Sequence, residues 1–338
     1  MVAELPGATL SAGPRRGLTR RRSTTVLGRV GWIVVQAVVM LFVVSTLVFF
    51  ATQAMPGDVA KVMLGMSATP ERVEALRHQL GLDRSLLSQY WDWLSGVLGG
   101  DLGTSLASGR PVSQMLGERL ANSATLSLFA IVLILPLSLL IGILAAQFKD
   151  SVFDRTFLWS SMVANALADF VVGTLLVALF GTTVFHWFPP VSLIPAGDMP
   201  WWHPQALTLP VATLVIGGVM YLSRLIRVSF IDVLNSEYVE MARLKGLGPT
   251  RILLTHALPN ALAPAVPAAS LVAAFTVGGV VVVEYLFGYP GIGALLIDSI
   301  SNRDLPVIQA VVLVIAAVYY FFNLLADLLH TGRSGERR

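Results

Sequence analysis

The sequence predicts an all-α polytopic membrane protein, and three observations support that prediction. The chain of 338 residues is 55% hydrophobic and 13% charged, whereas a soluble domain is about 25% charged. Its mean hydropathy is +0.74. Several long, mainly apolar windows reach the length of about 20 residues that a bilayer-spanning helix needs. We therefore expect six transmembrane helices.

The apolar windows divide the chain into spans, loops and tails. The predicted order is a basic tail at 1–29, span one at 30–52, an external loop at 53–123, span two at 124–146, span three at 157–181, an external loop at 182–206, span four at 207–226, a cytoplasmic loop at 227–264, span five at 265–284, an external loop at 285–305, span six at 306–329 and a tail at 330–338. The first apolar window is longer than the roughly 7–15 residues of a signal-peptide core, so we expect it to remain as a span.

The first external loop is too long for a plain connector. It contains the helix-like segments "TPERVEALRHQLG" and "SLLSQYWDWLSGVLGG", each ending at glycine. We expect a small external subdomain there. Lysine and arginine are concentrated in the two tails and in the loops after spans two and four, with few in the short loops of the other side. By the positive-inside rule, both termini and the loop 227–264 are predicted to be cytoplasmic.

Several kinds of chemistry have no sequence signal in this chain. It contains no GxxxxGK[ST] phosphate loop, no HExxH, no GxSxG and no cysteine, and its five histidines lack ligand spacing. We therefore expect no catalytic residue, no metal site and no enzymatic activity from this chain alone. The net charge of +3 is explained by loop bias rather than by nucleic-acid binding.

Asp169 is the one acid that falls in the middle of a predicted span. An intramembrane charge marks function by default, so Asp169 is a candidate pathway residue that would line a translocation path, bind a cation or pair with a neighbouring subunit. The alternative is a structural acid, hydrogen-bonded to an adjacent helix or placed in a wet cavity. The sequence leaves both open.

The segment 237–259, "EYVEMARLKGLGPTRILLTHALP", interrupts the apolar pattern with charge. Ser236 is a plausible N-cap for a helix with acids in its first turn and bases in its last. Gly246 is suited to the left-handed conformation that ends a helix, and Pro249 to the first position of a second helix that stops near Pro259. The result is a helical knob, and it suits either a protein socket or a place on the lipid headgroups.

This segment resembles the signature of the membrane subunits of ABC importers, which is Glu-Ala-Ala, three residues, Gly, nine residues, then Ile-x-Leu-Pro. Glu240, Ala242, Gly246, Leu258 and Pro259 stand at those spacings, while Met241 and His256 depart from it. The histidine, together with 80–112, 281–309 and 323–330, is similar to the dipeptide/oligopeptide and nickel permease branch. In span three, Ala168 stands where that branch commonly has proline, which leaves the local kink open.

The resemblance implies a bacterial inner-membrane permease subunit for a peptide-like solute, whose cytoplasmic coupling helix docks on an ATPase. It implies three kinds of partner: a second homologous permease, two ATP-binding subunits (or one fused) that bind ATP-Mg, and an external solute-binding protein. The ATPase-coupling residues would be Glu240, Met241, Ala242, Arg243, Lys245, Gly246, Gly248, Leu258 and Pro259. The alternatives are a stand-alone secondary transporter or channel, which would need ionisable relays or inverted repeats, and a membrane scaffold.

Overall fold

The computed structural model describes residues 26–54, 68–79, 83–195 and 197–334, with positions 61, 64 and 81. Most of the tail predicted at 1–29 and part of the first external loop lie outside these residues. The elements are α1 (Val26–Gln53), α3 (Pro70–Gln79), α4 (Leu86–Leu98), α5 (Val112–Gln147), α6 (Val152–Ala166), α7 (Asp169–Leu176), the π-helical η2 (Val177–Thr182), η3 (Pro200–Trp202), α8 (Pro204–Leu234), α9 (Glu237–Leu244), α10 (Pro249–Arg251), the π-helical η4 (Ile252–Ala257), α11 (Leu258–Phe287), α12 (Ile292–Asn302) and α13 (Leu305–Ser334).

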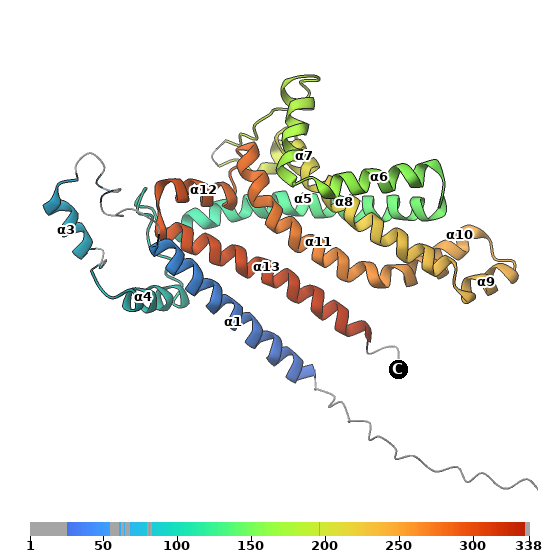
Figure 1. Cartoon of the computed structure of the whole chain (residues 1–338), viewed down its shortest axis with the longest axis horizontal. Coiled ribbons are helices and arrows are strands. Elements are labelled where there is room, and N and C mark those ends of the chain that lie inside the picture. Colours follow the sequence, from blue (N-terminus) through green and yellow to red (C-terminus); the bar gives the residue numbers. More distant parts are fainter. Residues whose placement is uncertain are drawn as a thin grey trace, which may run out of the picture.

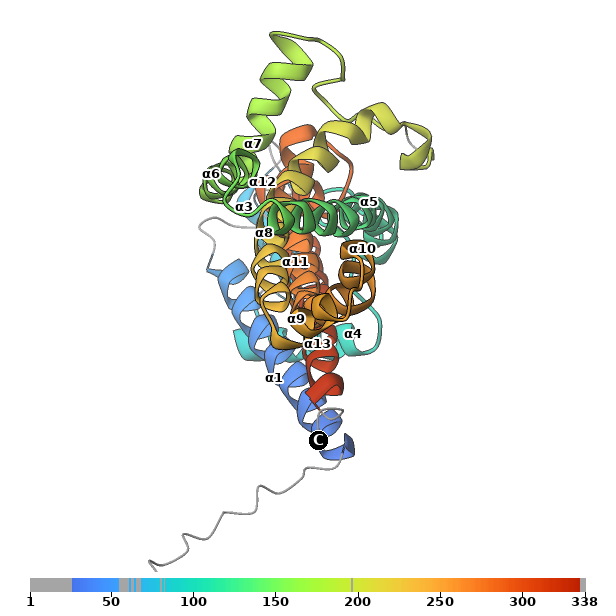
Figure 2. The same cartoon turned by 90° about the vertical axis from the view of Figure 1, so that its right-hand side faces the viewer.

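The prediction of an all-α polytopic fold is confirmed. Among the described residues, five helical segments are long and apolar enough to cross a membrane, and a sixth candidate is the pair formed by α6 with α7 and η2. The long helices lie roughly side by side, with α9 and α10 at one end and α3, α4 and α12 at the other (Figure 1). The N-terminal end of α1 and the C-terminal end of α13 point toward the end that carries α9 (Figures 1 and 2).

The third predicted span differs most from expectation, because 157–181 is not one continuous helix. α6 and α7 are bent by 107° at a short break. Leu167 and Ala168 interrupt the helix with extended ψ angles of 135° and 150°. The break therefore forms without the proline that the permease branch commonly carries there.

Three other helices run beyond their apolar windows. α5 begins at Val112 rather than near 124, because Val112 and Leu116 are buried against Ile292 and Leu295 of α12 and Val307 of α13. Prolines lie inside two of these helices, Pro210 in α8 and the pair Pro264 and Pro267 in α11. Membrane helices tolerate internal proline because neighbouring helices and side chains satisfy the freed carbonyls.

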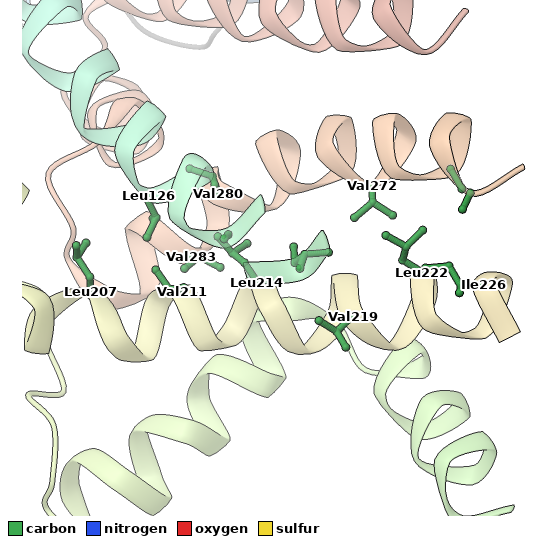
Figure 3. Close-up of a cluster of buried hydrophobic side chains, with 14 of the residues drawn as sticks. Leu126, Leu207, Val211, Leu214, Val219, Leu222, Ile226, Val272, Val280 and Val283 are labelled. Carbon is green, nitrogen blue, oxygen red and sulfur yellow. The ribbon is translucent and has the colours of Figure 1, made fainter. Parts of the chain in front are cut away.

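The core lies where α8 packs against α5 and α11 (Figure 3). Two glycines allow α5 and α8 to approach closely. A Cβ at Gly218 of α8 would lie 2.6 Å from Ile134 of α5, and a Cβ at Gly142 of α5 would lie 2.7 Å from Ile226 of α8. The two contacts are eight residues apart on both helices. In each, an isoleucine of one helix packs on a glycine of the other, and the two helices exchange these roles between the contacts. Small residues of this kind let membrane helices gain van der Waals contact.

The segment between α1 and α5 is tied to the membrane helices at two points. The Tyr90 hydroxyl of α4 lies 3.0 Å from the hydroxyl oxygens of both Ser45 and Thr46 of α1. The carboxylate of Asp304, between α12 and α13, accepts a hydrogen bond of 2.5 Å from the Ser105 hydroxyl and one of 3.0 Å from the Leu106 backbone N–H. These bonds hold the segment against α1 and α13.

Span five was predicted to end at Glu284, but α11 continues to Phe287 and Glu284 is completely buried. Its carboxylate accepts a hydrogen bond of 2.7 Å from the Gly293 N–H, and so satisfies one of the free N–H groups at the start of α12. A Cβ at Gly291 would collide with this carboxyl group. The turn between α11 and α12 therefore requires glycine at 291.

Gly291→Ala is expected to destabilise the protein by about 1–3 kcal/mol, the usual range for forcing extra atoms into a packed site. The matched control is Gly278→Ala on α11, where a Cβ would meet nothing within 4 Å. Thermal unfolding of the two purified variants tests the prediction. Equal midpoints would show that the turn can rearrange around the added methyl group.

Candidate functional site

The segment 236–257 forms a helical knob at one end of the molecule, in front of the ends of α8 and α11 in Figure 2. We call it the α9 knob. Its first helix begins after Ser236, as predicted, but Ser236 does not cap it. The Ser236 hydroxyl donates a hydrogen bond of 2.5 Å back to the carbonyl of Val233, in the last turn of α8. Ser236 therefore ties α9 to α8.

The inner face of the knob is a small apolar cluster. Val239 and Ala242 of α9 and Ile252 are buried together, with Val233 and Leu247 packed at the edge. Residues 239 and 242 are three apart and so share one helix face. Ala242, one of the predicted coupling residues, therefore faces inward and fixes how α9 lies on the rest of the knob.

Gly246 ends α9 in the left-handed conformation, with φ of +77°. Its N–H donates to the carbonyl of Arg243 at 2.9 Å, and the N–H of Leu247 donates to the carbonyl of Ala242 at 3.2 Å. Residues other than glycine are strained in this conformation. The prediction for the conformation of Gly246 is confirmed. Gly248, at φ −66°, needs no such freedom.

The predicted second helix differs from expectation. It begins at Pro249, but only 249–251 are α-helical, and 252–257 form a π-helical turn that leads directly into α11. Pro259 lies in the first turn of α11, where a missing N–H costs little. Pro259 therefore does not stop a helix. Leu258 and Pro259 belong to the start of the membrane helix, so movement of the knob would act directly on α11.

The outer face of α9 is apolar and exposed. Tyr238, Met241 and Leu244 are 43%, 56% and 77% exposed, respectively. They are spaced three residues apart and form a stripe along α9, next to the face that buries Val239 and Ala242. The charged side chains of Glu240, Arg243 and Lys245 are exposed beside them. An apolar stripe with a charged border is typical of a surface that another protein covers.

A cavity of about 610 Å³ separates the knob from the ends of α5 and α8. Lys149 and Arg243 contribute positive charge to its wall, and Ile231, Leu247 and Leu253 contribute apolar surface. The knob rests on the helix ends through its apolar cluster and through Leu253 and Ala257, which pack against the main core.

A buried ion pair joins two membrane helices close to the knob. Asp154 of α6 and Arg227 of α8 have side chains that are 2% and 12% exposed. Arg227 donates from Nε to Oδ1 at 2.5 Å and from Nη2 to Oδ2 at 2.6 Å. Sequence reasoning missed the pair, since Arg227 was assigned to the loop after span four. The only local signal was Asp154 in the first turn of a helix that Ser151 caps.

Asp169 is the first residue of α7 and lies at the break between α6 and α7. It lines a cavity of about 210 Å³, together with residues of α6, α8 and α11. It is far along the chain from the knob, and no described contact joins the two. Among the described residues, no group of three or more His, Asp or Glu side chains is arranged to hold a metal ion.

The combination of apolar spanning helices and a helical knob at one end is that of a transporter permease subunit. The chain matches the family described as "Binding-protein-dependent transport system inner membrane component" over residues 138–332. A second match, to the N-terminal domain of such membrane components, covers residues 30–139. The chain belongs to this family, and it is an ABC transporter permease subunit and a multi-pass inner membrane protein.

Two relatives show how much of the chain the similarity covers. The chain is 36% identical over 290 residues to the glutathione transport system permease protein GsiC of Escherichia coli, which is 86% of this chain and 92% of that one. It is 35% identical over 299 residues to a probable peptide ABC transporter permease protein of Sinorhizobium fredii, covering 88% and 95%. Family membership implies partners in general terms, an ATPase and a binding protein, and sets aside the stand-alone transporter and scaffold alternatives.

Proposed function

We propose that this chain forms half of the translocation path of an ATP-driven importer of peptide-like solutes, and that its α9 knob docks on an ATP-hydrolysing subunit. The observation that carries the proposal is the exposed apolar stripe of Tyr238, Met241 and Leu244. When a helix outside the spanning segments buries one side and still exposes apolar side chains on another, the exposed apolar surface marks a site for a binding partner.

Both ends of the knob are joined directly to long membrane helices, so the knob can transmit movement to each of them. α9 follows α8 after a two-residue connection, and η4 passes into α11 without a break. A rigid-body shift of the knob would therefore pull on α8 and push on α11 together. Glu240, Met241, Arg243 and Lys245 are the contact residues in this proposal, Gly246 and Gly248 shape the turn, and Leu258 and Pro259 pass the movement to α11.

We place the α9 knob and both termini in the cytoplasm, and the segment with α3, α4 and α12 outside. The charge bias of the loops supports this orientation. The N-terminal end of α1 and the C-terminal end of α13 point toward the end that carries α9 in Figure 1, so we place them on the same side as the knob. A second homologous permease would complete the path, and two ATP-binding subunits, separate or fused, would bind ATP-Mg. An external solute-binding protein would deliver the solute to the opposite end.

Peptide-like solutes are the proposed cargo because the two relatives are named for peptide and glutathione transport. Reconstituted vesicles containing the permeases, the ATPases and the binding protein test the proposal with two probes, a labelled tripeptide and labelled glutathione. We expect uptake of at least one probe that requires both ATP and the binding protein. Uptake that continues without ATP would contradict the coupling, and ATP-dependent uptake of other solutes alone would contradict the cargo.

A further inference from the structure

The cavity beside Asp169 is open to the surface of this chain, and it contains an unusual set of groups for the membrane-spanning part of a protein. Its wall includes the carboxylate of Asp169, the aromatic rings of Tyr221 and Phe275 and the side-chain amide of Asn165. The amide nitrogen of Asn165 donates to the carbonyl of Ser161 at 2.7 Å, which leaves its amide oxygen free to accept. No lysine or arginine lines the cavity.

The Asp169 carboxylate has no hydrogen bond or ion pair to any other residue that the structure describes. Two glycines make room for it. A Cβ at Gly279 of α11 would lie 2.7 Å from Oδ2, and a Cβ at Gly217 of α8 would lie 3.5 Å from Oδ1. The fold thus leaves the Asp169 carboxyl group open to the cavity.

This chemistry selects a cation that carries N–H donors. A carboxylate binds an ammonium or guanidinium group by charge-assisted hydrogen bonds, and aromatic faces attract the same cations. A volume of about 210 Å³ is below the roughly 300–1,000 Å³ of pockets that enclose a whole drug-sized ligand. The cavity therefore suits the charged end of a longer molecule.

We propose that the Asp169 cavity is a subsite on the translocation path that holds a primary ammonium group, such as the amino terminus of a peptide, while the solute passes. The proposal rests on the proposed function, because the cavity must face that path. The α6–α7 break gives it a structural basis, since the bend is what brings the first residue of α7 beside α8 and α11.

The chain has no cysteine, so single cysteines can be introduced without removing any other. Ala164→Cys places a thiol in the cavity wall, and Leu193→Cys gives a control thiol at a site that is 76% exposed. Each variant is assembled with its partner subunits, without ATP or binding protein. It is then reacted with methanethiosulfonates that carry either a primary ammonium (2-aminoethyl) or a sulfonate (2-sulfonatoethyl) group. Mass spectrometry of this chain over time gives the reaction rate with each reagent.

The ratio of the reaction rate with the cationic reagent to the rate with the anionic reagent is measured at position 164 and divided by the same ratio at position 193. We expect the result to be about tenfold or more, because one nearby charge attracts one reagent and repels the other in a partly buried site. Asp169→Asn should remove the preference and Asp169→Glu should keep it. If Asp169→Asn does not assemble, the ratio at position 164 with Asp169 intact still decides.

A ratio near one, no reaction at position 164 with either reagent, or a preference unchanged by Asp169→Asn would overturn the subsite. These outcomes are separate from those that would overturn the importer itself, because the labelling requires neither transport nor ATP. An importer that takes up peptides only with ATP, and yet shows no charge preference at position 164, would leave the proposed function standing without this subsite.

Discussion

Gly246→Pro is expected to reduce ATP-dependent uptake to background while the protein remains inserted in the membrane. Proline fixes φ near −65°, and the native φ at this position is +77°. Proline also removes the N–H that donates to the carbonyl of Arg243. The end of α9 must then rearrange, and the exposed stripe of Tyr238, Met241 and Leu244 loses its orientation on the knob. Uptake in reconstituted vesicles measures the effect, and the amount of protein in the membrane controls for insertion.

Two matched variants separate backbone conformation from loss of glycine. Gly246→Asn should retain most of the uptake, because asparagine enters the left-handed region more readily than other residues and a Cβ there meets nothing within 4 Å. Gly248→Ala should be close to wild type, since Gly248 has an ordinary φ of −66° and open space around it. Normal uptake in Gly246→Pro would show that the turn does not transmit the coupling.

Asp154→Ala is the second large effect that we expect, a loss of about 3–5 kcal/mol of stability, because it leaves Arg227 as an unpaired charge in the protein interior. Asp154 accepts two hydrogen bonds from Arg227 and one of 2.9 Å from the Asp150 N–H. All three are lost together. Arg227→Ala should have an effect of similar size. Thermal unfolding of the purified complex measures both variants.

The control is an exposed ion pair of the same kind. Arg84 and Asp92 lie 3.1 Å apart with side chains 63% and 64% exposed, and such pairs contribute about 0–1 kcal/mol. Asp92→Ala should therefore change the unfolding midpoint little. If Asp154→Ala were no more harmful than Asp92→Ala, the Asp154–Arg227 pair would not be what holds α6 against α8.

The features that sequence predicted well are local ones. The start of α9, the left-handed Gly246 and the start of a new helix at Pro249 all follow from neighbouring residues in the chain. Pro259 marks where local reasoning failed. A proline normally ends a helix, but here a π-helical turn precedes it and places it in a first turn. A single sequence does not encode that shift in hydrogen-bond register in any simple pattern.

Long-range features could not be predicted, because they depend on which helices meet. Asp154 and Arg227 are 73 residues apart, and nothing in their spacing indicates a pair. Glu284 was predicted to be the last residue of span five, yet α11 continues beyond it and the turn that returns as α12 buries it. Asp169 was noticed as an intramembrane acid, but the aromatic rings beside it come from α8 and α11. Which residues from different helices lie together can be seen only in the folded structure.

The central claim is that the exposed stripe of α9 contacts the ATPase subunit, and cross-linking from Met241 tests it most directly. Met241→Cys is at a site that is 56% exposed, and the control Leu193→Cys lies near the C-terminal end of α11, away from the knob. Each is labelled with benzophenone maleimide before the ATPase subunits are added, and the transporter is then assembled. Illumination should join this chain to the ATPase subunit from position 241 and not from position 193. Adducts from position 241 with lipid alone, or equal ATPase adducts from both positions, would contradict the account.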